Sequence, residues 1–159
     1  MRQQPFCAKT GVRTFEAAAF LRRCGADVTR VRKMFREHVE DYRAKGEAIR
    51  NAELFREHFA ISVCPSEGLD SPTVVGAQAA NELLNIIGVK ASFVLTDYRN
   101  TIYISARSID EINVQIVMER LGGGGHLNIA GAQLEHYSIT EAKDVLKQTL
   151  QKMLDEGDI

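Results

Sequence analysis

This sequence of 159 residues has no tryptophan, only three cysteines and no long apolar run. Cys7, Cys24 and Cys64 lie far apart, their number is odd, and no C-x-x-C motif occurs. We therefore expect neither a disulfide framework nor a zinc site, and reduced thiols indicate a cytoplasmic location. No segment has the length of a membrane span or the pattern of a signal peptide, so we expect this chain to make no membrane contact.

The charges of the chain nearly balance. Its 20 basic and 21 acidic side chains leave a formal net charge of -1, which provides no overall electrostatic attraction to nucleic acid. Apolar residues make up 45% of the sequence. This content is enough to form the core of one domain, or of one domain with an appendage.

The pattern of apolar residues predicts an α/β domain with a small mixed β-sheet and flanking helices. Residues 1–12 are expected to be irregular or strand-like, and two helices follow, over 14–21 and from 27 to about 54. The remaining expected elements are a strand at 59–63, a helix at 71–88, a hairpin of strands 91–96 and 101–105, a helix at 112–121, a strand at 133–139 and a last helix that begins with the capping-box residues Ser138 and Glu141 and ends near 154. A boundary near 52–59 divides the chain into domains 1–55 and 56–159.

The helix expected from residue 27 to about 54 carries one apolar stripe. The stripe consists of Val28, Val31, Phe35, Val39, Tyr42, Gly46 and Ile49, at steps of three and four residues. We favour packing of this stripe within its own domain. The alternative is pairing with a helix of another chain, which would make these residues an oligomerisation unit and the protein a homodimer.

Four consecutive glycines, Gly122-Gly123-Gly124-Gly125, stand between the helix expected at 112–121 and His126. An ordered glycine loses more backbone entropy on folding than any other residue, so this run needs a reason other than stability. Without Cβ atoms, backbone N–H groups can approach an anion such as a phosphate closely, and His126 adds a side-chain donor beside them. A flexible linker is the alternative, although linkers usually mix glycine with serine.

A second group of polar residues, Ser105, Arg107 and Ser108, ends the predicted hairpin. Ser105 and Arg107 share one face because side chains alternate along a strand. An arginine beside two hydroxyls can clamp a phosphate, since a guanidinium binds phosphate in a bidentate way. An ordinary surface arginine is the alternative, and the glycine run one helix later strengthens the case for the clamp.

No pattern in the sequence supplies a nucleophile. The chain has no Ser-His-Asp order, no P-loop and no H-E-x-x-H motif. It also lacks a group of aspartates and histidines spaced to hold a metal ion, which could acidify water. We therefore expect no catalytic residue and no metal site, and the chain looks like the substrate-holding half of an enzyme.

The glycine run with His126 and Ala130-Gly131-Ala132, preceded by residues 104–108, resembles the DHH-associated domain of the DHH phosphoesterases. Residues 9–27 look like the tail of the catalytic DHH domain, so a helical remnant of that domain is expected before the α/β domain. The stretch 113–134 is most similar to the membrane-anchored cyclic-di-AMP phosphodiesterases of Gram-positive bacteria. The resemblance covers nearly the whole chain.

This resemblance implies that the chain is the substrate-binding C-terminal part of a manganese-dependent cyclic-dinucleotide phosphodiesterase. The expected substrate contacts are Ser105, Arg107, Ser108, Gly122, Gly123, Gly124, Gly125 and His126. The family holds two manganese ions through aspartates and an Asp-His-His motif upstream, and a further aspartate usually precedes the segment matching residues 6–10. This chain has only Arg2, Gln3 and Gln4 there. We therefore expect no cofactor and no activity in this chain alone, within a membrane-anchored parent whose catalytic lobe completes the cleft.

An accessory domain that binds nucleic acid is the alternative interpretation. Related domains occur in DHH-type exonucleases, oligoribonucleases and alanyl-tRNA synthetases. The ligand would then be a short oligonucleotide in place of a cyclic dinucleotide. Such a role favours a basic face, and the net charge of -1 argues mildly against it.

Overall fold

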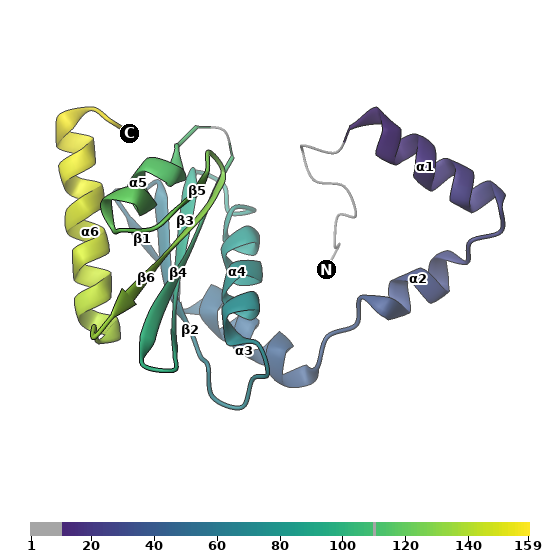
Figure 1. Cartoon of the computed structure of the whole chain (residues 1–159), viewed down its shortest axis with the longest axis horizontal. Coiled ribbons are helices and arrows are strands. Elements are labelled where there is room, and N and C mark those ends of the chain that lie inside the picture. The colour runs from purple at the N-terminus through teal and green to yellow at the C-terminus, as the bar shows by residue number, and fades with distance from the viewer. Residues whose placement is uncertain (1–10, 110) are drawn as a thin grey trace. The chain divides into compact units, whose positions relative to one another are not determined.

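A computed structural model describes residues 11–109 and 111–159 of the chain (Figure 1). The expectations for residues 1–10 lie outside the described residues. The chain divides into two compact units between Glu37 and His38. The first unit contains the helices α1 (Val12–Arg23) and α2 (Val28–Met34). The second unit contains α3 (Val39–Arg50), β1 (Glu53–Phe55), β2 (Phe59–Cys64), α4 (Pro72–Leu83), β3 (Ala91–Tyr98), β4 (Thr101–Ser108), α5 (Val114–Arg120), β5 (Gly124–His126), β6 (Ile129–Glu135) and α6 (Ile139–Glu156).

The prediction of one long helix from residue 27 to about 54 is wrong. Two separate helices, α2 and α3, occupy most of this stretch, and the strand β1 follows them. Asp27 caps α2 by accepting backbone N–H bonds, and Glu40 and Asp41 lie in the first turn of α3. Acidic groups stabilise helix N-termini, so these charges mark two helix starts. The continuous stripe on which the homodimer alternative rested is absent.

The strands of the second unit form one mixed sheet with the order β1-β2-β3-β4-β6-β5. β2 and β3 are parallel, and every other neighbouring pair is antiparallel. Parallel neighbours need a crossover connection, and α4 supplies it. The predicted α/β class with a small mixed sheet is therefore confirmed.

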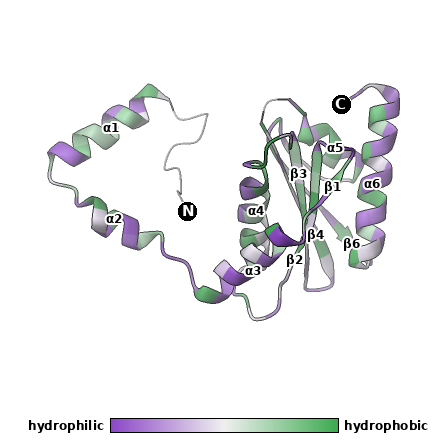
Figure 2. Ribbon diagram, turned by 180° about the vertical axis from the view of Figure 1, so that it is seen from behind, coloured by the Kyte–Doolittle hydropathy of each residue, from purple (hydrophilic) through white to green (hydrophobic). Residues whose placement is uncertain are grey.

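The helices cover the two faces of this sheet unequally (Figure 1). α5 and α6 cover one face, where Phe93, Ile104 and Leu146 belong to the larger apolar core. α3 and α4 lie on the other face, and their smaller core reaches only β2 and β3, through residues such as Ala60 and Val94. Figure 2 shows the alternation of apolar and polar residues along these elements. The part of the second face formed by β4, β6 and β5 adds no residue to that core, and we call it the open half-face.

Several element ends differ from the sequence prediction. β3 and β4 continue to a two-residue turn at Arg99 and Asn100, both with positive φ, where a loop from residue 97 was expected. β6 begins at Ile129 and ends at Glu135, earlier than the predicted strand at 133–139. The reason is the strand β5, which pairs with the start of β6. Part of the glycine run is therefore an edge strand.

The capping box predicted for the last helix is confirmed. The Ser138 hydroxyl accepts a hydrogen bond from the Glu141 N–H at 3.2 Å, and the Glu141 carboxylate accepts one from the Ser138 N–H at 2.8 Å. The Ser138 hydroxyl also donates to the Glu141 carboxylate, at 2.7 Å. The bonds from the Ser138 N–H and hydroxyl lower the pKa of Glu141 below its usual value, because they favour its charged form.

The expected division into domains 1–55 and 56–159 stays a prediction about the parent protein. In the structure, α3 and β1 belong to the sheet unit: Ala44 and Ala48 of α3 are buried in the smaller core, and β1 pairs with β2. Among the described residues, no helix combines the length and the apolar character that a membrane span requires.

Candidate functional site

The register of β4, β6 and β5 brings together residues that are distant in the sequence. Ser105 lies opposite Gly131, and Gly131 lies opposite Gly124. Directly paired residues point to the same face of a sheet, so these three form a row across the open half-face. Because neither glycine carries a side chain, the backbone beside Ser105 is bare.

A second row lies next to the first on the same face. Arg107 lies opposite Ile129, and Ile129 lies opposite His126. Ile129 is 52% exposed, Arg107 is half-buried and His126 is exposed. The two rows together place Ser105, Arg107 and His126 on one surface with Gly124 and Gly131.

An open groove of about 520 Å³ follows the first row. It is lined by residues 103–105 of β4, residues 122–124 of the glycine run and residues 131–133 of β6. Its floor is mostly backbone, because four of its lining residues are glycines: Gly122, Gly123, Gly124 and Gly131. Arg107 and His126 border the groove in the adjacent row.

The first two glycines of the run end a helix. Gly122 has φ of +77°, a conformation that favours glycine. Its N–H bonds the carbonyl of Glu119 at 3.0 Å, and the N–H of Gly123 bonds the carbonyl of Met118 at 2.8 Å. This is the Schellman pattern at a helix C-terminus. The expectation that these two N–H groups would be open to an anion is therefore wrong, since α5 already uses them.

Close packing explains two glycines of the run. A Cβ atom at Gly123 would lie 2.2 Å from the carbonyl oxygen of Gly131, and one at Gly125 would lie 2.5 Å from the Cα atom of Ala130. Any side chain there would push β5 away from β6. These glycines are therefore required by the fold alone.

Neither the end of α5 nor close packing explains why residue 124 is a glycine. A Cβ atom at Gly124 would meet no atom within 4 Å, and its φ lies outside the left-handed region. The position lines the groove on the open half-face. A Cβ atom at Gly122 would also meet no atom within 4 Å, but the positive φ of Gly122 already favours glycine. Among the four glycines, Gly124 alone combines open space with a φ that other residues can adopt.

Arg107 is held in place and keeps donors free for a ligand. Its Nη1 donates to the carbonyl of Ala106 at 2.8 Å and more weakly to that of Ala130 at 3.5 Å. Within the described part of the chain, neither Nε nor Nη2 has a hydrogen-bond partner. Burial lowers the pKa of Arg107, although a guanidinium stays charged in proteins. A partly desolvated cation attracts an anion more strongly than an exposed one.

Ser108 does not join this surface. It points to the opposite face of β4, where it is 6% exposed, and its hydroxyl lies 3.4 Å from the carbonyl of Leu127 and 3.5 Å from Oδ1 of Asn128. The expected clamp of Arg107 between two hydroxyls is therefore wrong in its geometry, because alternation along the strand leaves only Ser105 beside the arginine.

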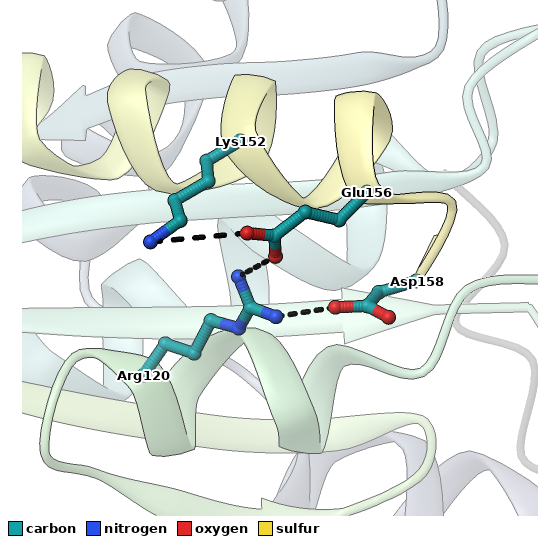
Figure 3. A network of polar contacts seen from close by, with 4 residues as sticks. All are labelled: Arg120, Lys152, Glu156 and Asp158. Atoms are coloured by element: carbon teal, nitrogen blue, oxygen red, sulfur yellow. Dashed lines mark hydrogen bonds and ion pairs between the residues drawn. The ribbon is translucent and has the colours of Figure 1, made fainter.

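A polar network fixes the end of α5 that leads into the glycine run (Figure 3). Arg120 forms ion pairs with Glu156, at 2.7 Å, and with Asp158. Lys152 lies 3.8 Å from the other oxygen of Glu156. The hydrogen bond from Arg120 is the main cause that lowers the pKa of Glu156. The network connects the last turn of α5 to the C-terminal end of α6.

The described residues contain no group of side chains that could hold a metal ion. Within 11–109 and 111–159, no three side chains of histidine, cysteine, aspartate or glutamate converge on one point. The manganese ions that the resemblance implies therefore do not fit the residues described here.

The predicted substrate contacts did not include five residues that line the groove: Tyr103, Ile104, Gly131, Ala132 and Gln133. Tyr103 was predictable, because it precedes Ser105 and Arg107 in the same alternation along β4. Gln133 was not, since its place depends on the register between β4 and β6, where it lies opposite Tyr103.

Comparison with known proteins identifies a family match and several relatives. The model of the DHHA1 domain matches residues 58–153. The cyclic-di-AMP phosphodiesterase GdpP of Geobacillus thermodenitrificans is 40% identical over 153 residues, which is 96% of this chain and 23% of that protein. The cyclic-di-AMP phosphodiesterase PdeA of Listeria monocytogenes is 41% identical over 142 residues, which is 89% of this chain and 22% of that protein. The chain thus spans less than a quarter of these relatives.

Solved structures agree with the fold. An exopolyphosphatase-related protein from Bacteroides fragilis superposes with a TM-score of 0.78 at 22% identity, covering 91% of this chain and 44% of that one. A pGpG-specific phosphodiesterase from Vibrio cholerae gives a TM-score of 0.53 at 13% identity, covering 92% of this chain and 52% of that one.

Proposed function

Since this chain belongs to the DHHA1 domain family, we propose that its open half-face holds the nucleotide substrate of a phosphodiesterase. The relatives named as cyclic-di-AMP phosphodiesterases support cyclic-di-AMP as that substrate. The observation that carries the proposal is the unoccupied space over Gly124, beside the row that contains Arg107 and His126.

Each residue has a defined part in holding the substrate. The Nε and Nη2 groups of Arg107 donate to phosphate oxygens, which suit the planar geometry of a guanidinium. The bare backbone at Gly124 lets a phosphate or a sugar approach closely. Ser105 and His126 add hydrogen bonds from either side of the glycine, and Ile129 offers an apolar contact for a base.

We propose that the residues of the open half-face do not catalyse hydrolysis themselves. The open half-face supplies binding and orientation, and the catalytic lobe of a longer protein supplies the metal site and the attacking water. We propose manganese as that metal, and a membrane-anchored parent protein. This chain alone is accordingly proposed to bind its substrate without hydrolysing it.

The surface does not favour the nucleic-acid alternative. Among the described strand residues of the open half-face, the formally charged side chains are Arg107 and Glu135. A protein that tracks a nucleic-acid backbone presents a basic stripe instead. A cyclic dinucleotide, which carries two phosphates, needs only a small number of cationic contacts.

The test uses a protein that joins this chain to its catalytic lobe. Loss of a hydrogen bond to a charged group costs about 1.5–3 kcal/mol, so Arg107→Ala and His126→Ala should each lower kcat/KM for cyclic-di-AMP roughly ten- to a hundredfold. Manganese content should stay unchanged. Arg99→Ala, in the turn at the far end of β4, is the matched control and should keep full activity.

The chain without its lobe is the negative control and should release no linear dinucleotide. If Arg107→Ala and His126→Ala both fold and keep the kcat/KM of the parent, the substrate is held elsewhere and the proposal is wrong. Hydrolysis of cyclic-di-AMP by the isolated chain, after removal of contaminating enzymes, would contradict the proposal that catalysis requires the other lobe.

A further inference from the structure

The turn that follows His126 lacks the backbone geometry of a self-sufficient hairpin. Leu127 and Asn128 connect the paired residues His126 and Ile129. Two-residue hairpin turns usually have positive φ at their central residues, because that twist matches the twist of the strands. Arg99 and Asn100 in the β3–β4 turn follow this rule, with φ of 53° and 62°. Leu127 and Asn128 both have negative φ, so this turn lacks the φ pattern that usually matches a two-residue turn to its strands.

Neighbouring elements support the turn. The carbonyl of Leu127 accepts a hydrogen bond from the Val114 N–H at 3.0 Å, at the start of α5. The carbonyl of Asn128 accepts one from the Ser108 N–H at 3.1 Å. The Ser108 hydroxyl lies within 3.5 Å of both Leu127 O and Asn128 Oδ1, and its single proton can serve either acceptor.

Ser108 and Asn128 are both buried, so losing one of these polar contacts costs stability. Ser108 is 6% exposed and Asn128 is 8% exposed, so water cannot readily replace a lost partner. A buried polar group without a partner loses its solvation free energy. The N–H and the hydroxyl of Ser108 both contact this turn and stabilise the arrangement that it has.

We propose that Ser108 is a positioning residue, which fixes the Leu127–Asn128 turn and thereby aims His126 across the open half-face. This inference rests on the proposed function, because it takes His126 to contact the nucleotide. It replaces the expected substrate contact of Ser108, whose hydroxyl faces the core side of the sheet. Ser108 acts on the substrate only through His126.

The first measurement needs no ligand. Hydrogen exchange is followed at the amides of residue 108 and Val114, which donate to the turn. Ser108→Ala should speed exchange at both amides roughly threefold to tenfold, the range expected for one net hydrogen bond. Ser62→Ala is the matched control: Ser62 is also buried, and its hydroxyl donates to the carbonyl of Ala48 far from this turn. Ser108→Thr keeps the hydroxyl and should restore slow exchange.

The second measurement separates positioning from direct contact. The Kd of this chain for cyclic-di-AMP is measured for Ser108→Ala, His126→Ala and the double variant. If Ser108 acts through His126, its substitution weakens binding roughly threefold to tenfold alone and adds nothing once His126 is absent. Ser108→Thr should bind like the parent chain.

Three results would overturn the inference: unchanged exchange in Ser108→Ala, additive effects on Kd, or equal effects of Ser62→Ala. If His126→Ala leaves the Kd unchanged, the proposed contact of His126 is wrong and Ser108 cannot position it for binding, whereas the Arg107 test of the proposed function is unaffected. If Ser108→Ala fails to fold, Asn128→Ala takes its place with the same expected exchange and the same non-additivity.

Discussion

A Cβ atom at Gly123 would collide with the carbonyl oxygen of Gly131, at 2.2 Å, whereas a Cβ atom at Gly124 would meet nothing within 4 Å. Two adjacent glycines thus have different reasons to lack a side chain. The fold requires the first, since β5 could not otherwise approach β6. The proposed ligand requires the second. This contrast offers a test inside a single run of identical residues.

We predict opposite outcomes for substitutions at these two positions. Gly123→Ala should lower the free energy of unfolding by about 1–3 kcal/mol, the usual cost of overpacking. Gly124→Val should leave stability nearly unchanged and abolish binding of cyclic-di-AMP, because its side chain enters the groove. Urea unfolding and calorimetric titration measure the two effects. A Gly124→Val chain that is stable and binds as tightly as the parent would show that the glycine serves no ligand.

Residue patterns predicted part of the site and misplaced the rest. Alternation along a strand put Ser105 and Arg107 on one face, and the same rule should have removed Ser108 from that face. A glycine after the last turn of a helix is an ordinary helix stop, which accounts for Gly122 without any ligand. The position of Gly131 opposite Gly124 could not be predicted, because it depends on strand register.

At the scale of elements, α1 and α2 differ from the rest of the chain. Neither helix has a buried residue, and large apolar side chains such as Phe20 (59%) and Leu21 (57%) are exposed. Helices of this length are marginal in water without tertiary packing. This segment resembles the tail of a catalytic domain, and we propose that the catalytic lobe of a longer protein covers these side chains.

We therefore predict weak protection of the first unit in the isolated chain. Hydrogen exchange in residues 14–24 should be faster by orders of magnitude than in β2, β3 and β4, because local opening there exposes little additional apolar surface. The measurement is made on the monomer. Joining the catalytic lobe should raise the protection of residues 14–24, and protection equal to that of the sheet in the isolated chain would contradict this account.

Element ends were harder to predict than element types. In the sequence, apolar residues recur at steps of three and four from Val28 to Ile49, so periodicity alone could not reveal the break between α2 and α3. The signals that mark two separate helix starts are Asp27, which caps α2, and the acidic residues Glu40 and Asp41 in the first turn of α3. The last helix was predictable because Ser138 and Glu141 form a complete start signal.

We predict that the stability contributed by the capping box at the start of α6 depends on pH. Hydrogen bonds from Ser138 lower the pKa of Glu141 in the folded state. A depressed carboxylate pKa contributes stability above its unfolded pKa, and this contribution disappears as the pH falls through the folded value. Glu141→Gln should thus be less stable than the parent at pH 7, and the difference should shrink below about pH 4. Urea midpoints between pH 7 and pH 3 measure it; a difference that does not change with pH would contradict the assignment.

The sheet unit is covered by helices on one face and only partly on the other. α3 and α4 pack over β2 and β3, and the groove lies over β4, β6 and the glycine run. An enzyme that holds its substrate between two lobes needs such an uncovered face on each of them. The fold of the sheet unit was predictable as a class, but its open half-face followed only from the arrangement of helices over the sheet.

The most direct test of this account is a map of nucleotide binding on the isolated, isotope-labelled chain. Cyclic-di-AMP is titrated into the chain without metal, and backbone and side-chain NMR shifts are followed. We predict that the largest changes occur at Ser105, Arg107, Gly124, Gly131 and His126, and that Gly124→Val abolishes them. Changes confined to α6 or to the first unit, or changes that persist in Gly124→Val, would contradict the claim that the open half-face holds the substrate.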